Sequence, residues 1–281
     1  MIKKILVGVK GDKGSDNALR YAARLASITG AQLTALHVIE ELDEYHFYEI
    51  YEHIQLRYEA EVKREKEECI QQIKAVCDEC GLVKIDIEIM HGNPAKGILR
   101  EARRGSYDLI VVGSHGKSRF LEFLLGGVAF QILHYAKHPV LVVKRLKKLQ
   151  TILACTDGSR YARDAMKFTA KIAKPAKSQV TVLFVARGGC AQLPGSREIA
   201  EQGENILKKR GIDAETKIRE GPPAEEILRE ARRKDYDLIV MGHKGKSSIR
   251  EFLLGDAVSK VTHHSLRPTL IYREKKKGSF K

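Results

Sequence analysis

The chain has 281 residues, of which 43% are hydrophobic and 31% charged, with a formal net charge of +14. This composition is typical of a soluble globular protein, and the length is sufficient for two domains. Apolar runs fall short of the roughly 18–20 residues of a membrane span, and the charged N-terminus leads directly into a strand pattern, so we expect no membrane contact, no signal peptide and a cytoplasmic location.

The positive charge has two interpretations. A basic surface could bind nucleic acid or an acidic membrane. However, Lys and Arg are spread along the whole chain, and no aromatic-interleaved RNA-binding motif is present. We therefore expect a solvated surface rich in Lys and Glu, a basic tail at 276–281, and no nucleic-acid partner.

Strands alternate with helices from the N-terminus onward. The first helix places Ala18, Leu19, Ala22 and Leu25 on one face, and Ser15 or Asp16 could cap it. A long charged helix follows from about 48 to 80, and Asn93-Pro94 begins the next helix as cap and first residue. Short apolar, β-branched runs predict strands at 4–9, 31–39, 83–90, 108–113 and 138–144.

The second half of the chain repeats the first. Residues 221–257 match residues 92–128 at 24 of 37 positions, and 152–169 align with 5–22. The two offsets, 129 and 147, differ because the first copy carries 18 extra residues in its middle. We call the two halves copy 1 and copy 2, and expect domains at 1–145 and 150–275. Copy 2 predicts strands at 151–156, 179–186, 214–220, 237–242 and 267–274.

This order of elements predicts an α/β fold in each copy. Strands that alternate with helices form a doubly wound, parallel sheet of five strands with right-handed crossovers. Ligands of such sheets bind beyond the carboxyl ends of the strands, near the point where the strand order reverses. The turns after the first and fourth strands are therefore where we expect a site.

A glycine-rich segment follows the fourth strand of each copy. Glycines let the backbone approach a ligand, and their N–H groups can converge on an anion with help from a helix N-terminus. The Gly-Lys-Ser strings at 116–118 and 245–247 lack the spacing and the position of a P-loop. The segment reads Gly113-Ser114-His115-Gly116, nine residues, then Gly126-Gly127 in copy 1, and Gly242-His243-Lys244-Gly245, nine residues, then Gly255-Asp256 in copy 2.

Over nearly all of its length the chain resembles a tandem universal stress protein. The resemblance rests on Thr156-Asp157-Gly158-Ser159, the Gly-x-Pro helix starts, the YDLIV strands, the G-x2-G-x9-G segments and the final strands. It implies a flavodoxin-like fold and, as in a subset of the family, an adenine nucleotide (ATP or AMP) that Mg²⁺ could accompany. The implied ligand contacts are Lys10, Val38, Gly113, Ser114, Gly116, Gly126, Gly127 and Val128 in copy 1, and Asp157, Val185, Gly242, His243, Gly245 and Gly255 in copy 2.

Each copy departs from the pattern of the nucleotide-binding members. In copy 1, Gly127 replaces the Ser or Thr that follows the last glycine, and Lys10 replaces the Asp after the first strand. Copy 2 keeps Asp157, but Asp256 stands where phosphates would lie. A carboxylate there repels a triphosphate, unless Asp256 caps the next helix instead. Copy 1 thus looks better for phosphates, and copy 2 better for adenosine or AMP.

The final strand of each copy lies at a sheet edge in this fold. Exposed apolar edges usually find a partner, and single-domain members of the family dimerise through this strand. The resemblance therefore implies that 140–144 and 269–273 pair within one chain and form an internal pseudo-dimer. The whole chain could form a homodimer as well.

Two further features leave alternatives open. Cys77 and Cys80 form a C-x-x-C motif that could bind metal or act in redox chemistry, although no second C-x-x-C is present and neighbouring positions on a helix explain the spacing equally. The aromatic residues between Tyr45 and Tyr58 could form a lid, a partner surface or a helix packing face.

The function expected from these features is a non-enzymatic stress-response protein. A bound adenine nucleotide would act as a regulatory or stabilising ligand and shift the population of one arrangement. The alternative is an interaction scaffold with degenerate pockets, which the residues at 127 and 256 favour. Weak ATP hydrolysis ranks last, because the sequence offers no general base or metal ligand for it.

Overall fold

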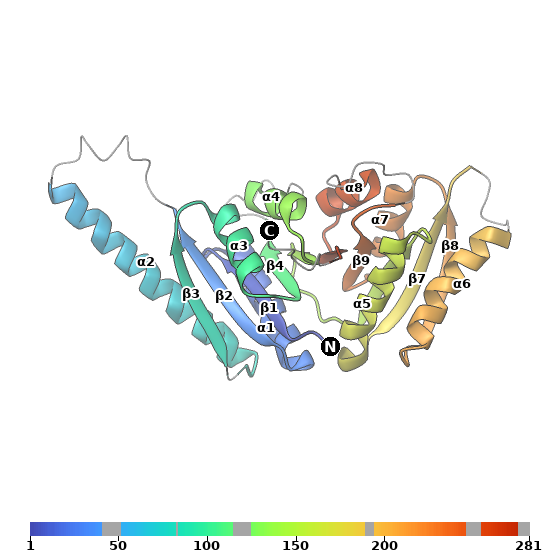
Figure 1. Cartoon of the computed structure of the whole chain (residues 1–281), viewed down its shortest axis with the longest axis horizontal. Coiled ribbons are helices and arrows are strands. Elements are labelled where there is room, and N and C mark those ends of the chain that lie inside the picture. The colour runs from blue at the N-terminus through green and yellow to red at the C-terminus, as the bar shows by residue number, and fades with distance from the viewer. Residues whose placement is uncertain (41–51, 83, 115–124, 189–193, 246–253, 275–281) are drawn as a thin grey trace, which may run out of the picture.

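The computed structural model describes residues 1–40, 52–82, 84–114, 125–188, 194–245 and 254–274. The predicted order of strands and helices is confirmed in both copies (Figure 1). Copy 1 contains β1 (Lys4–Val9), α1 (Lys13–Thr29), β2 (Gln32–Ile39), α2 (Glu52–Glu79), β3 (Ile85–His91), α3 (Pro94–Arg104), β4 (Leu109–Gly113), α4 (Gly127–Tyr135) and β5 (Val140–Val143). Copy 2 contains β6 (Thr151–Thr156), α5 (Arg160–Ala176), β7 (Gln179–Ala186), α6 (Pro194–Lys208), β8 (Ala214–Glu220), α7 (Pro223–Arg233), β9 (Leu238–Gly242), α8 (Asp256–His264) and β10 (Thr269–Tyr272).

The strands form one ten-stranded sheet in the order β3-β2-β1-β4-β5-β10-β9-β6-β7-β8. Pairing is parallel within each copy and antiparallel between β5 and β10. Leu141 pairs with Leu270, its equivalent in the other copy, so a pseudo-two-fold axis passes between them. The predicted internal pseudo-dimer of two doubly wound, flavodoxin-like units is confirmed. The strand order reverses between β1 and β4, and between β6 and β9, so a ligand crevice is expected at those strand ends.

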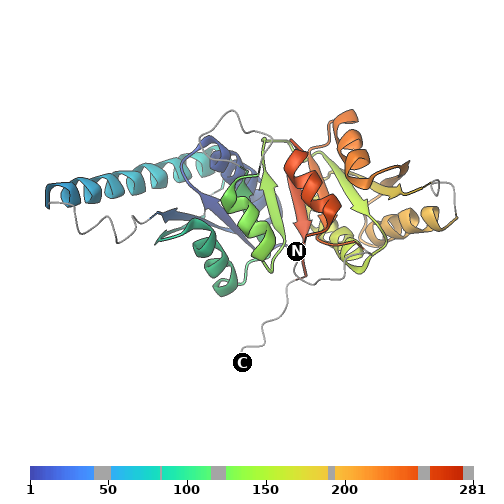
Figure 2. The ribbon, with the colours of Figure 1, turned by 90° about the horizontal axis from the view of Figure 1, so that it is seen from above.

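Helices cover both faces of the sheet, and each face has a core that crosses the β5–β10 seam. Helices α1, α2, α5 and α6 cover one face, and α3, α4, α7 and α8 cover the other. Seen from above, α4 and α8 lie side by side over the centre of the molecule (Figure 2). On the first face, Leu141 and Val143 share a core with Leu270. On the second face, Val140 and Val142 share a core with Ile271. The two copies therefore share their hydrophobic cores.

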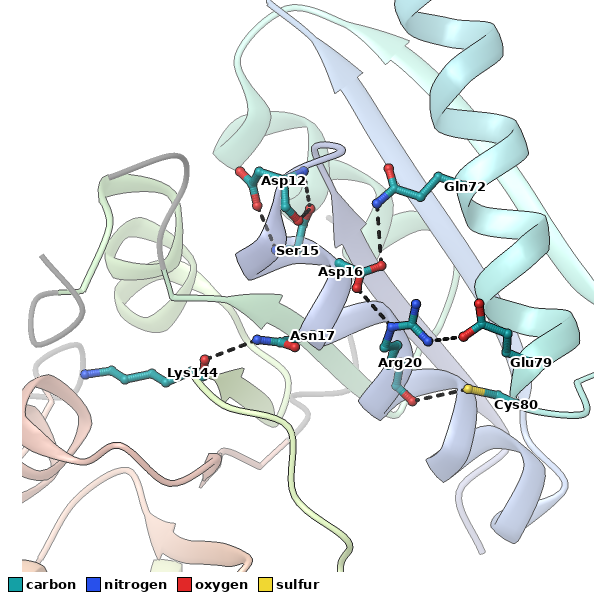
Figure 3. Close-up of polar contacts among 9 residues, drawn as sticks. All are labelled: Asp12, Ser15, Asp16, Asn17, Arg20, Gln72, Glu79, Cys80 and Lys144. Carbon is teal, nitrogen blue, oxygen red and sulfur yellow. Dashed lines mark hydrogen bonds and ion pairs between the residues drawn. The ribbon is translucent and has the colours of Figure 1, made fainter. Parts of the chain in front are cut away.

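The N-cap of the first helix lies three residues before Ser15, the first of its two predicted caps. Asp12 is the N-cap of α1, and its Oδ1 accepts the Ser15 N–H at 2.8 Å (Figure 3). Ser15 Oγ accepts the Asp12 N–H in return, at 3.2 Å, which completes a capping box. The expectation that Ser15 or Asp16 is the cap is therefore wrong. Asn93 does cap α3, as predicted, with Oδ1 accepting the Lys96 N–H at 3.0 Å.

The extra residues of copy 1 make α2 a helix of 28 residues, whereas α6 has 15. The C-terminal half of α2 contributes the core residues Cys69, Ile73, Val76 and Cys77. Polar contacts hold this half against α1, because Arg20 bonds both Asp16 and Glu79 (Figure 3). The aromatic stretch predicted as a lid or packing face lies mostly outside the described residues.

The two cysteines of the C-x-x-C motif pack at this α1–α2 interface. Cys77 is 1% exposed, and burial raises the pKa of its thiol to about 11. The Cys80 Sγ lies 3.9 Å from the Arg20 carbonyl oxygen (Figure 3). The described residues contain no group of three or more potential metal ligands. A raised pKa disfavours the thiolate that metal binding and redox chemistry need, so the contacts support a packing role.

Two cations, Lys144, which is half-buried, and Arg273, which is buried, tie the copies together across the seam. Lys144 follows β5, and its Nζ donates to the His263 carbonyl at the end of α8 at 2.5 Å. Arg273 is the equivalent residue of copy 2, and its Nη2 donates to the Leu133 carbonyl at the end of α4 at 2.7 Å. Burial lowers the pKa of Lys144 to about 8 and that of Arg273 to about 10. Each copy thus satisfies carbonyls at the C-terminus of the other copy's helix, where cations are favoured.

Candidate functional site

Each copy has a cavity at the carboxyl ends of its first and fourth strands. The cavity of copy 2 has a volume of about 710 Å³, and that of copy 1 about 170 Å³. Both lie where the strand order reverses, between β6 and β9 in copy 2 and between β1 and β4 in copy 1. These are the positions at which doubly wound sheets bind ligands.

The copy 2 cavity combines apolar walls with a few polar groups. Its walls come from β6, β7 and β9, from the start of α7 and α8, and from Ile199 on α6. The strand and helix residues include Cys155, Leu183, Phe184, Val185, Ile227, Met241 and Val258. The charged residues that line the cavity are Asp157, Arg187, Lys244 and Asp256. Ligand pockets typically have this composition, in which apolar contacts supply area and polar groups fix orientation.

The first glycine of each glycine-rich segment is required by packing. A Cβ on Gly242 would lie 2.7 Å from the backbone carbon of Tyr161, and one on Gly113 would lie 2.6 Å from the backbone of Gly14. Neither backbone can move without disturbing the first turn of the adjacent helix. Glycine at these positions therefore brings the end of the fourth strand against the helix that follows the first strand.

The last glycine of each segment fixes the start of the next helix. The Gly255 N–H donates to the His243 carbonyl at 3.0 Å, and the Gly126 N–H donates to the Ser114 carbonyl at 2.6 Å. Gly255 and Gly126 are the N-caps of α8 and α4, and neither helix has a side-chain cap hydrogen bond. The first backbone N–H groups of both helices therefore border the cavities, and such groups favour anions.

Asp157, directly after β6, also lines the copy 2 cavity. Its Oδ1 accepts the Ser159 N–H at 2.9 Å. A Cβ on Gly245 would lie 2.7 Å from its Oδ2, so this glycine lets the segment approach the carboxylate closely. Asp157 and Gly245 together present a hydrogen-bond acceptor and a close backbone at one end of the cavity.

The equivalent polar end of copy 1 has its charges reversed. Lys10 occupies the position of Asp157, and Glu40 that of Arg187. Lys10 Nζ and Glu40 Oε1 form an ion pair at 2.7 Å across the ends of β1 and β2. The lysine that was expected to reach a ribose or phosphate is thus engaged by a carboxylate of its own copy.

Asp256 lies at the entrance of the copy 2 cavity. It is the first residue of α8 rather than its cap, which is Gly255, so the alternative that Asp256 caps this helix is wrong. Its Oδ2 lies 3.0 Å from Lys260 Nζ one turn later, and both side chains are largely exposed. A negative charge in the first helical turn is favourable for the helix but competes with any ligand anion at the same N–H groups.

His243 was expected to contact the ligand, but the structure does not place its side chain in the cavity wall. The ring is 7% exposed and makes an edge-on contact with the Tyr161 ring, with centroids 4.3 Å apart. Its Nδ1 has no hydrogen-bond partner. Burial lowers the pKa of His243 to about 4, with further contributions from the positive charges of Arg273 and Lys244. His243 is therefore a buried neutral ring whose backbone carbonyl holds Gly255.

The other predicted site residues that the structure describes all line a cavity. Gly116 lies outside the described residues, as do His115, Lys117 and Lys246. Sequence reasoning missed the apolar strand-end residues and Arg187, although the position of Arg187 directly after β7 was a usable signal. Copy 1 brings together Lys10, Val38, Gly113, Ser114, Gly126, Gly127 and Val128, and copy 2 brings together Asp157, Val185, Gly242, Gly245 and Gly255.

Comparison with known proteins identifies the family of both copies. The model of the universal stress protein family matches residues 1–144 and again residues 148–273. A universal stress protein of Mycolicibacterium smegmatis is 27% identical over 288 residues and spans 96% of each chain. One from Methanocaldococcus jannaschii is 32% identical over 153 residues, covering 53% of this chain and 85% of its own.

A solved structure shares the arrangement of the whole chain. The crystal structure of a universal stress protein from Archaeoglobus fulgidus has a TM-score of 0.75 at 22% identity, covering 96% of this chain and 98% of its own. Among the helices of the described residues, none is both long and apolar enough to cross a bilayer. The two matches of the family model, which together cover nearly the whole chain, place this chain in the universal stress protein family, as a member with two tandem family domains.

Proposed function

We propose that copy 2 binds one adenine nucleotide as a regulatory or stabilising ligand rather than as a substrate for turnover. The observation that carries this proposal is the cavity of about 710 Å³ between Asp157 and the N-terminus of α8. Its lining combines a fixed carboxylate, apolar side chains and helix N–H groups, which suit the ribose, the base and a phosphate of a nucleotide.

Each part of a nucleotide has a suitable neighbour in this cavity. Leu183, Val185 and Ile227 offer apolar contact to a base. The carboxylate of Asp157 can accept hydrogen bonds from ribose hydroxyl groups. The N-terminus of α8 favours one phosphate, but Asp256 opposes the accumulation of further negative charge. AMP therefore fits the electrostatics better than ATP, and Mg²⁺ would reduce the difference.

The bound nucleotide can be tested directly. Freshly purified protein is denatured, and the released small molecules are identified by chromatography and mass. We expect about one adenine nucleotide per chain, and a larger rise in melting temperature with AMP than with ATP. Empty protein that shows no thermal shift with millimolar AMP, ADP or ATP would contradict the proposal.

A matched pair of variants assigns the site to one copy. Ala257 and Val128 are equivalent positions on α8 and α4, and each lines the cavity of its own copy. Ala257→Phe should fill the copy 2 cavity and lower nucleotide affinity at least about 10-fold, because it removes the room for the base or phosphate. Val128→Phe should leave affinity within about 2-fold. Equal losses in both variants, measured by calorimetric titration, would place ligand in both copies.

Asp256 should control the preference among nucleotides. Asp256→Asn removes the negative charge and keeps the size, so ATP affinity should rise relative to AMP. The side chain is 74% exposed, so solvent screening limits the effect to about 1 kcal/mol, or roughly 5-fold. Calorimetric titrations with and without Mg²⁺ measure this ratio. An unchanged ratio would show that the ligand phosphate lies away from the start of α8.

The structure of copy 1 favours a second role for that half of the molecule. Its cavity is about 170 Å³, and Lys10 is paired with Glu40 at the polar end. We infer that copy 1 acts as an interaction scaffold, joined to a ligand-responsive copy 2 through the shared sheet and cores. Nucleotide released at two per chain would argue against this division of roles.

A further inference from the structure

Two equivalent carboxylates lie buried beside the edge strands of the sheet. Glu101 on α3 is 3% exposed, and Glu230 on α7 is 2% exposed. Their neighbours β3 and β8 are the outermost strands of the ten-stranded sheet. Burying a carboxylate is costly unless a cation or hydrogen-bond donors compensate its charge. The two copies differ in the groups that they place beside this buried carboxylate.

Copy 2 supplies two cations from its own edge strand. Lys217 Nζ lies 3.0 Å from Glu230 Oε1, and Arg219 Nη2 lies 2.7 Å from Glu230 Oε2. Burial alone would raise the pKa of Glu230, but the hydrogen bonds from Arg219 and Lys217 outweigh it and hold the pKa below its ordinary value. Both oxygens of this carboxylate are therefore paired with positive charge.

Copy 1 lacks both cations at the equivalent positions. Glu88 replaces Lys217, and Met90 replaces Arg219. Glu101 Oε1 accepts the Tyr107 hydroxyl at 3.1 Å, whereas Oε2 is buried and has no hydrogen-bond partner. Burial and then the negative charge of Glu101 raise the pKa of Glu88. The same place in the fold thus holds two interacting carboxylates in copy 1 and a neutralised one in copy 2.

The charged groups around this pair do not replace the missing cations. Arg104, on the next turn of α3, is exposed, and its charge only partly offsets the rise in the pKa of Glu88. Arg100 Nη2 lies 3.5 Å from Met90 Sδ. Asp86, on the same strand as Glu88, adds negative charge and accepts Gln32 Nε2 at 2.6 Å.

We propose that Glu88 and Glu101 form a binding site for a cationic nitrogen group, an ammonium or a guanidinium, supplied from outside the chain. The unpartnered Oε2 of Glu101 gives the ligand an acceptor, and Glu88 adds the second negative charge. Copy 2 shows that this position in the fold accommodates both an ammonium and a guanidinium beside the carboxylate. Charge-assisted hydrogen bonds of this kind are short and strong, and a guanidinium can bind two acceptors at once.

The cation could come from a small molecule or from a protein chain. Glu88 is partly exposed on an edge strand, so a free amine can reach it. A Lys or Arg in an extended segment could reach it too, since an edge strand offers free backbone groups to a further strand. The site is independent of the nucleotide cavity, because none of its residues lines that cavity.

Two probes distinguish these sources on the full chain. Agmatine carries an ammonium and a guanidinium, and a peptide with the sequence of residues 214–220 carries Lys and Arg in an extended segment. The double variant Glu88→Lys/Met90→Arg reproduces the copy 2 arrangement, so it should fold, melt at a higher temperature and fill the site with its own side chains. We expect wild-type protein to bind agmatine at least 10-fold more tightly than this variant, by calorimetric titration at pH 7.5.

A matched control and the remaining outcomes complete the test. Glu67→Gln removes an exposed carboxylate of α2, away from the pair, and should bind agmatine like wild type. If the peptide alone binds and the double variant loses it, the cation comes from a chain, and the proposal stands. Equal binding of both probes to wild type and double variant would overturn it. So would the absence of binding by either probe to wild type.

Discussion

Leu270→Asp should unfold both halves of the molecule in a single transition. Leu270 is fully buried in β10 and pairs with Leu141 at the pseudo-two-fold axis. The substitution loses about 2–3 kcal/mol of apolar transfer energy and buries a carboxylate without a partner, which costs several kcal/mol more. A total loss of at least about 5 kcal/mol would bring a domain of ordinary stability close to unfolding. Since both cores cross the seam, neither copy can lose this strand alone.

Urea denaturation followed by circular dichroism, with fluorescence probes placed in each copy, measures this effect. Leu141→Asp should behave in the same way, because it occupies the equivalent position across the axis. The control Ile28→Asp changes a partly exposed apolar residue of α1 and should cost less than about 1 kcal/mol. Two separate transitions, with copy 1 intact while copy 2 unfolds, would show that the copies are independent domains joined by a passive seam.

The seam was predictable because the family resemblance agreed with a pattern in the sequence. The final strand of each copy is a short apolar run, and the fold places it at an edge that needs a partner. Single-domain members of the family dimerise through this strand, so the resemblance implied that 140–144 and 269–273 pair within one chain. The strand boundaries could also be predicted from the sequence, because buried parallel strands appear as short β-branched runs between helices.

The contents of the sites were harder to predict, because they depend on side-chain direction and pairing between distant residues. A His within a glycine-rich segment looks like a ligand contact, yet the close approach of β9 to α5 directs His243 toward Tyr161. Asp12 caps α1, and Asp12 and Ser15 form reciprocal hydrogen bonds. Asp12, Ser15 and Asp16 are all suitable capping residues, so the local sequence alone did not show which of them is the cap. The ion pair between Lys10 and Glu40 joins the ends of neighbouring strands, and it becomes visible only when the strands are placed side by side.

Acidification below pH 6.5 should lower the free energy of unfolding, and part of this loss should come from protonation of His243. The folded protein holds the pKa of this ring at about 4, below its ordinary value of 6.5, because of burial and then the charges of Arg273 and Lys244. Between these values the unfolded chain binds a proton that the folded chain does not. The stabilising contribution is therefore complete above pH 6.5 and is lost as the pH falls to about 4. At about 1.4 kcal/mol for each pH unit, the loss amounts to about 3 kcal/mol.

The variant His243→Ser isolates this contribution from that of the carboxylates, which also titrate on acidification. Ser114 is the equivalent residue of copy 1 and is buried there, so the smaller side chain suits the position. Free energies of unfolding from urea titrations at pH 7 and pH 4.5 should fall less in the variant than in wild type, by about 2–3 kcal/mol. Equal losses in wild type and His243→Ser would mean that the ring titrates normally.

Protonation of His243 should also affect the candidate site, because a backbone hydrogen bond connects the two. The His243 carbonyl accepts the Gly255 N–H, and Gly255 is the cap of the helix whose N-terminus borders the copy 2 cavity. A proton on the buried ring would add a third positive charge beside Arg273 and Lys244 and favour conformations that expose His243. Such conformations release Gly255 and disturb the set of helix N–H groups that we assign to a ligand phosphate. Nucleotide affinity should therefore decline over the same interval, from pH 6.5 toward 4, and should decline less in His243→Ser.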